Sequence, residues 1–180
     1  MRAFLDFEAS SLAKESYPIE IAWAWEDGRE ETHLIRPAPG WTDWDERAAA
    51  IHGIARSELL SLGASHVEIA HRVVDSLGGH LVYASSPSWD GKWLSVLLRS
   101  AGLPRHALRL RDTDEAQLEA ARSGLQGRLT EDGLDAAAAE LIRRVRAANE
   151  GPIAHRALPD AAHELWLWRE IGKEARALAL

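Results

Sequence analysis

The residues of this chain that could do chemistry are mostly acidic and are widely spaced. Asp6 and Glu8 lie near the start, Asp90 lies mid-chain, and His155 precedes Asp160 near the end. Asp6 and Glu8 follow an apolar opening, and side chains two residues apart in a strand point to the same face. Carboxylates are hard oxygen ligands that suit divalent cations. If folding collects these five side chains, they would form a site for metal-assisted hydrolysis.

Each of these residues also has an ordinary structural interpretation. Acidic residues at a strand end are commonly just solvated. Asp90 precedes a run of helical periodicity, and capping and the helix dipole favour an aspartate there. Pro159 is expected to mark the opening of the last helix, with Asp160 in its first turn. A lone surface histidine before a helix, such as His155, usually has no special role. The case for a site therefore depends on the residues acting as a set.

Taken in order, the motifs resemble those of the DEDDh exonucleases, the proofreading-type 3′–5′ exonuclease superfamily with a ribonuclease H-like fold. Residues 4–12, with Asp6 and Glu8, look like the first motif, and residues 18–24 look like the strand that follows it. Asp90 matches the middle aspartate. His155 and Asp160 match the closing motif, including the Arg-Ala-Leu that follows the histidine. The resemblance covers residues from about 2 to about 168.

The resemblance implies a catalytic set that also holds metal. Asp6, Glu8, Asp90 and Asp160 would bind two divalent ions, Mg²⁺ or Mn²⁺, with Asp6 bridging them. Glu8 and Asp160 would complete the coordination of one ion, and Asp90 would help to hold the other. His155 would take a proton from the attacking water. The implied activity is removal of nucleoside 5′-monophosphates from the 3′ end of single-stranded DNA or RNA.

A second group of residues is expected to border the 3′ end of the substrate. Residues 50–54 resemble a turn that lies beside the bound 3′ end in relatives, and tryptophan faces can stack on bases. The expected substrate-binding residues are His52, Trp41, Trp44, Ser86 and Trp89. Trp23, Trp25, Trp166 and Trp168 are instead expected to pack internally. Some cationic help is available from Lys14, Lys92, Arg56 and Arg156, although such residues are mostly ordinary surface charges.

One departure from the family pattern lies just before Asp90. Relatives commonly carry a His-Asn pair there, and this chain has Ser85 and Ser86. The change puts the preferred substrate and the rate in question more than the metal site, because every charged ligand type is present. It also supports an alternative, a non-catalytic module that keeps the fold and grips a nucleic-acid end or a protein partner. A third alternative keeps the hydrolysis but acts on short or structured RNA, and the sequence does not decide between DNA and RNA.

Composition agrees with one globular, cytoplasmic domain across residues 1–180. The chain is 46% hydrophobic and 27% charged, and no apolar run approaches the roughly twenty residues that span a bilayer. The absence of cysteine excludes disulfides and thiolate metal sites. A net charge of −7 argues against a broad basic surface for binding nucleic acid. Nucleic acid should therefore bind locally and only when divalent metal is present. A homodimer or a polymerase or repair partner is left open.

Alternating and helical patterns predict an α/β fold with a mixed five-stranded sheet flanked by helices. The first three strands are expected to form an antiparallel meander with a hairpin turn at Asp27-Gly28, and two parallel strands are expected to follow. The expected strands are residues 2–7, 18–25, 31–36, 81–84 and about 108–112. The expected helices are residues 67–77, 91–101, 114–122, 132–148 and 159 onward.

Overall fold

A mixed six-stranded sheet forms the centre of the computed structural model, which describes residues 1–127, 130–149 and 154–178. The strand order is β4-β3-β2-β1-β5-β6. The first three strands pair antiparallel, β5 runs parallel to β1, and β6 runs parallel to β5. This confirms the predicted meander followed by parallel strands. The strands are β1 (Arg2–Ala9), β2 (Pro18–Trp25), β3 (Glu30–Arg36), β4 (Ala64–Ser65), β5 (Leu81–Ala84) and β6 (Leu110–Asp112).

The prediction of five strands was wrong by one short edge strand. β4 contains only Ala64 and Ser65, which pair in parallel with the end of β3. Two residues are too few to show the alternation by which a strand is identified from sequence. The position of β4 at the sheet edge is therefore a result of packing rather than of a local pattern.

The predicted hairpin between β2 and β3 is present at Asp27-Gly28. Gly28 has a φ of 95°, in the left-handed region that glycine adopts without strain. The Trp25 N–H donates to the Arg29 carbonyl at 2.8 Å, and the Gly28 N–H donates to the Trp25 carbonyl at 2.9 Å. The turn closes the β2–β3 pair, and β2 in turn pairs with β1, where Glu8 faces Glu20 directly.

The two faces of β1 have different surroundings because alternate side chains point to opposite sides. Ala3, Leu5 and Phe7 join the large apolar core with α3 (His66–Leu77) and α4 (Pro87–Ser100). On the other face, Phe4 packs against Tyr83, Ala116 and Leu165. Asp6 and Glu8 share that second face, so the sheet presents both carboxylates toward α7 (Ala157–Leu178).

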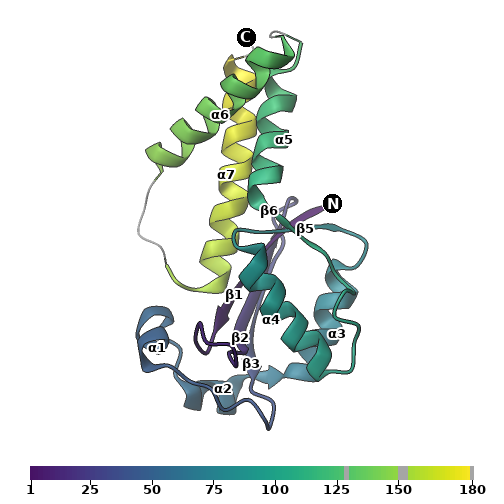
Figure 1. The fold of residues 1–180 in the computed structure, drawn as a ribbon, viewed down its shortest axis with the longest axis vertical. Coiled ribbons are helices and arrows are strands. Elements are labelled where there is room, and N and C mark those ends of the chain that lie inside the picture. The colour runs from purple at the N-terminus through teal and green to yellow at the C-terminus, as the bar shows by residue number, and fades with distance from the viewer. Residues whose placement is uncertain (128–129, 150–153, 179–180) are drawn as a thin grey trace.

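Helices α5 (Thr113–Leu125), α6 (Glu131–Ala148) and α7 lie side by side and extend away from α1 (Glu46–His52) and α2 (Arg56–Leu62), as Figure 1 shows. Gly124 allows the close approach of α5 and α7, because a Cβ atom there would lie 2.4 Å from the Ala175 Cβ. Within the described residues, no helix has the length and apolar character needed to cross a membrane.

The five predicted helices are present, and two short ones were missed. α1 covers most of the segment that the sequence suggested was a turn, and α1 and α2 contain seven residues each. Trp23 and Trp25 are buried as predicted. The packing prediction was wrong for Trp166, which is 39% exposed on the outer side of α7 and stacks on His163.

Candidate metal centre

Three carboxylates meet where the second face of β1 touches the start of α7. One ligand oxygen each from Asp6, Glu8 and Asp160 lies within 4.8 Å of the other two. β1 supplies two of them through its alternation, and the first turn of α7 supplies the third. The structure thus brings together residues from the two ends of the chain into a group that could hold a metal ion.

Asp90 adjoins this cluster without belonging to it. It lies buried in the first turn of α4, where its carboxylate accepts the Ser86 N–H at 3.3 Å. A backbone hydrogen bond from Phe7 ties the same carboxylate to β1. The interpretation of Asp90 as a helix-start carboxylate is therefore correct, and its negative charge also acts on Asp6.

Burial and mutual repulsion make these acids reluctant to ionise. Burial, followed by the charges of Asp90 and Glu8, raises the pKa of Asp6 to about 9. Burial, followed by the charge of Asp160, raises the pKa of Glu8 to about 7. Burial raises the pKa of Asp90 to about 7. A divalent cation would relieve both the repulsion and the lost hydration, so this all-oxygen donor set fits a hard cation.

His155 lies on the segment that leads into α7. Its φ of 49° is in the left-handed region, which costs a non-glycine residue roughly 1–2 kcal/mol. The side chain is exposed, and its charge opposes the burial that raises the pKa of Asp160. The imidazole therefore lies near the acidic cluster, on the solvent side.

Sequence reasoning missed Glu20, which anchors the start of α7. This buried carboxylate on β2 accepts two hydrogen bonds from the Arg156 guanidinium, at 2.6 and 3.0 Å, and one from the Ala157 N–H at 3.0 Å. It faces Glu8 across the β1–β2 pair, and its charge helps to raise the pKa of Glu8 after burial and Asp160. An acidic residue inside the otherwise apolar stretch 18–25 was the available signal.

Sequence reasoning also missed Glu164, one helical turn after Asp160. Its charge contributes to the raised pKa of Asp6, after burial and the larger effects of three other acids. The fully buried Gln117 of α5 donates to Glu164 at 3.2 Å and accepts from Arg146 of α6 at 2.9 Å. The spacing of four residues after Asp160 was the signal, because positions i and i+4 share a helix face.

Among the residues expected near the substrate, His52 is near enough to the Glu20–Arg156 pair for both charges to act on it. It is 4% exposed, and its Nδ1 accepts the Ile54 N–H at 3.0 Å, so its Nε2 is the protonated nitrogen of the neutral ring. That Nε2 is buried without a partner among the described residues. Gly53, with a φ of 70°, ends α1 and turns the chain after His52.

The expected aromatic residues form two groups. Trp44 lies edge-on to His52, with ring centroids 6.1 Å apart, whereas Trp41 stacks on Tyr17 at 5.2 Å. Trp89 is 38% exposed beside Asp90 and packs on Trp93. Ser86 is exposed at the N-cap of α4, where its hydroxyl makes no capping bond.

Three of the expected cations have partners within the protein. Lys92 donates to the Ala13 carbonyl and the Ser16 hydroxyl, Arg56 donates to the Trp41 carbonyl, and Arg156 pairs with Glu20. These side chains hold loops in place instead of extending freely into solvent. Lys14 is exposed.

Solved structures that are similar to this chain include those of exonuclease I. A zinc-bound complex of E. coli exonuclease I with single-stranded DNA matches at a TM-score of 0.68 and 15% identity, covering 96% of this chain and 40% of that one. Exonuclease I from Methylocaldum szegediense matches at 0.67 and 18%, covering 98% and 42%. An E. coli exonuclease I complex with a dA16 oligonucleotide matches at 0.66 and 17%, covering 98% and 42%.

These similarities identify the fold class of the chain. The chain has the exonuclease fold that the sequence motifs predicted, with its strands and helices matched over nearly their whole length. Among the individual proteins that it is similar to is exonuclease I, of whose length it spans about 40%. The sequence matches no family profile and no curated protein. The similarity at this identity therefore establishes the fold, and the activity has to be argued from the site.

Proposed function

We propose that residues 1–180 form a single exonuclease domain that removes nucleoside 5′-monophosphates from the 3′ end of single-stranded nucleic acid. The observation that carries the proposal is the meeting of Asp6, Glu8 and Asp160 within 4.8 Å. Asp90 next to this cluster and His155 on its solvent side complete the set that the sequence motifs suggested. The shared fold with exonuclease I gives independent support.

Two divalent ions, Mg²⁺ or Mn²⁺, would be held by Asp6, Glu8 and Asp160, with Asp90 supporting the second. When bound, the ions would supply positive charge for the phosphodiester and would acidify the attacking water. The raised pKa values of the acids support this assignment, because buried carboxylates that repel one another are stabilised in their ionised form by a nearby cation.

The role proposed for His155 is to take the proton of the attacking water as general base. Its exposed imidazole near Asp160 can receive that proton and pass it to solvent. Arg156 stays paired with Glu20 and offsets part of the negative charge beside Glu8. The left-handed backbone of His155 places a strained residue where the reaction needs a fixed base.

The proposed substrate is single-stranded DNA, since the exonuclease I structures hold such oligonucleotides. His52 and Trp44 would contact the terminal nucleotide from α1 and the loop before it, with Trp41 behind them. Ser86 and the exposed face of Trp89 would contact it from the start of α4. RNA is the competing substrate, because no described residue has an established contact to a 2′-hydroxyl.

A degradation assay tests the proposal directly. A 5′-labelled single strand incubated with Mg²⁺ or Mn²⁺ should shorten stepwise from its 3′ end, and a chelator should stop the reaction. Asp6→Asn should abolish shortening, whereas Asp75→Asn, which removes an exposed carboxylate on α3, should not. Parallel RNA and duplex DNA reactions identify the substrate class. Full activity of the Asp6 variant, or hydrolysis in the presence of chelator, would reject the site.

A second candidate function is a non-catalytic module that grips a nucleic-acid end. The specific observation in its favour is the Ser85-Ser86 pair, which offers smaller side chains than the pair common in relatives. Such a module would retain oligonucleotides at full length in the presence of Mg²⁺. The same degradation gel therefore distinguishes it from the enzyme.

A further inference from the structure

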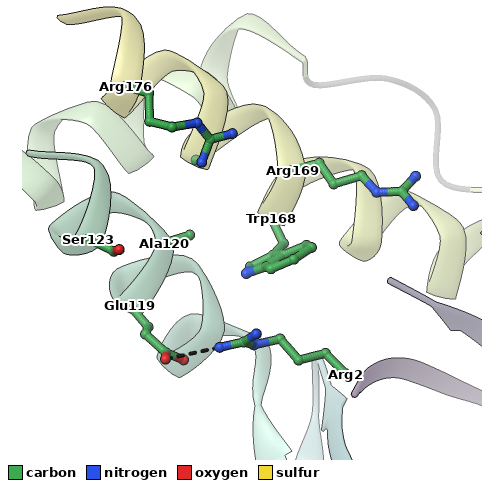
Figure 2. Close-up of a pocket in the computed structure, with 8 residues that line it drawn as sticks. Arg2, Glu119, Ala120, Ser123, Trp168, Arg169 and Arg176 are labelled. Atoms are coloured by element: carbon green, nitrogen blue, oxygen red, sulfur yellow. Dashed lines mark hydrogen bonds and ion pairs between the residues drawn. The ribbon is translucent and has the colours of Figure 1, made fainter. Parts of the chain in front are cut away.

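A cavity lies at the other end of β1, away from the acidic cluster. It has a volume of about 280 Å³ and opens between α5 and α7 beside the first residue of β1 (Figure 2). Arg2 lies four residues before Asp6 along the strand, roughly 13 Å at strand rise. Trp168 lies eight residues after Asp160 along α7, about 12 Å at helix rise. The cavity is therefore separate from the candidate metal centre.

The charged groups around this cavity are mainly cationic. Arg2, Arg169 and Arg176 line it, and Glu119 is the one carboxylate among the described lining residues. Arg2 donates to Glu119 at 3.0 Å and stays within 3.5 Å of Glu26. Arg169 donates to the Glu26 carbonyl at 2.9 Å. In a chain with a net charge of −7, an excess of guanidinium groups around one cavity is a local reversal of sign.

The polar groups that remain without partners are hydrogen-bond donors. Arg2 Nε is buried without a partner, and among the described residues no hydrogen bond or ion pair is made by the Arg176 guanidinium. Figure 2 shows the indole nitrogen of Trp168 on the side of the ring toward Ala120, and it has no hydrogen bond within the described residues. The Ser123 hydroxyl completes the lining from α5. Unpaired hydrogen-bond donors around a cavity favour a ligand with many hydrogen-bond acceptors.

Small side chains line the cavity where α5 and α7 approach each other. A Cβ on Gly172 of α7 would lie in van der Waals contact with Ala120 of α5, 3.7 Å from its Cβ. The same Cβ would lie 3.3 Å from the Arg176 guanidinium, so the glycine gives that side chain its room. The volume is close to the lower end of small-molecule sites, roughly 300–1,000 Å³, and is larger than one oxyanion requires.

We propose that this cavity binds the phosphate group of a nucleoside monophosphate. The donors come from β1, α5 and α7, so they surround the space from several directions, which suits the tetrahedral oxygens of a phosphate better than a planar carboxylate. The Arg176 guanidinium contacts the phosphate, and the Ser123 hydroxyl and the Trp168 indole N–H donate from the lining beside it. The remaining volume takes the sugar. This site does not depend on the nuclease activity, because none of its residues belongs to the acidic cluster.

Titration calorimetry in the presence of chelator tests the site without any turnover. Adenosine 5′-monophosphate should bind, inorganic phosphate should compete with it, and adenosine should bind at least about tenfold more weakly, a difference of about 1.4 kcal/mol. Arg176→Gln should weaken binding of the monophosphate by a similar factor. Arg143→Gln, which removes a matched arginine from an exposed ion pair on α6, should leave binding unchanged. Ala120→Leu should fill the cavity and abolish binding.

The outcomes separate this site from the metal centre. Binding that survives Asp6→Asn and is weakened in Arg176→Gln supports the proposed phosphate site, whether or not the protein degrades DNA. No binding at millimolar monophosphate, equal binding of adenosine and its monophosphate, or loss of binding only in the Asp6 variant would overturn it. A Ser123→Ala variant, which removes only one hydroxyl, should show a smaller loss and guards against a folding artefact of Ala120→Leu.

Discussion

Replacing Glu20 by glutamine should loosen the start of α7 and slow the proposed reaction. Glu20 is 3% exposed and accepts three hydrogen bonds, two from Arg156 and one from the Ala157 N–H. Glutamine can keep one acceptor oxygen, and with it at most two of the three bonds. Its amide NH₂ would then face the remaining donor of Arg156. The change preserves shape, so it tests the charge and the acceptors rather than packing.

The free energy of this change can be worked from the contacts. A hydrogen bond to a charged group contributes about 1.5–3 kcal/mol, and removing one member of a fully buried ion pair costs roughly 3–5 kcal/mol. Arg156 is 44% exposed, so water can solvate it after the change, and the loss of the Glu20 charge relieves repulsion on Glu8. We therefore expect a fall of about 1–2 kcal/mol in the free energy of unfolding.

The functional effect should exceed what the stability loss alone would produce. His155 and Asp160 flank the residues that Glu20 holds, and loss of a supporting residue behind a metal ligand typically costs 10–100-fold. We expect kcat on a 3′ end to fall within about that range and Mn²⁺ affinity to weaken. Loss of the repelling charge should also lower the pKa of Glu8.

Glu31→Gln is the matched control for this experiment. Glu31 forms the same two-bond pair with Arg72, at 2.8 and 2.9 Å, but on β3 and closer to solvent. It should cost less than about 1 kcal/mol and leave turnover unchanged. The reasoning is refuted if Glu20→Gln unfolds at the same urea concentration as wild type and keeps full Mn²⁺ affinity, or if both variants lose activity equally. The stability and metal readouts apply even if the chain has no nuclease activity.

Further outcomes follow from the same structure. Without metal, the free energy of unfolding should fall by at least about 1.4 kcal/mol between about pH 5 and pH 8. The reason is that folded Asp6, Glu8 and Asp90 hold protons that the unfolded chain has released. Urea titrations in chelator measure this change, and a flat or rising profile would contradict it. Asp6→Asn should reduce the slope, and Mn²⁺ should stabilise the wild type more than this variant in thermal melts. Gly124→Ala should lower the free energy of unfolding by about 1–3 kcal/mol despite the better helix propensity of alanine, because the added Cβ would clash with Ala175. A melting temperature equal to or above that of the wild type would show that α5 and α7 can separate at little energetic cost. Trp89→Ala should weaken single-strand binding by about 1–3 kcal/mol in fluorescence titrations with little change in unfolding, and unchanged affinity would remove Trp89 from the proposed substrate contacts.

Local sequence patterns predicted the elements that carry the metal centre. Alternation placed Asp6 and Glu8 on one face of β1, and Asp160 lies in the first turn of α7 as expected. The hairpin at Asp27-Gly28 was predictable because its backbone conformation needs glycine. The short elements α1, α2 and β4 were missed, since few residues leave little periodicity to detect.

The sequence by itself determined the order of the main strands and helices, the shared face of Asp6 and Glu8, and an exonuclease-like set of motifs. Each strand, helix and motif depends on residues within a few positions of one another, so local rules of side-chain direction and turn geometry suffice to recognise it. Only the tertiary structure decided that Asp160 reaches Asp6, and that Glu20 holds Arg156. Such meetings depend on how α7 packs across the sheet, a sum of many weak contacts between distant segments that no short stretch of sequence contains.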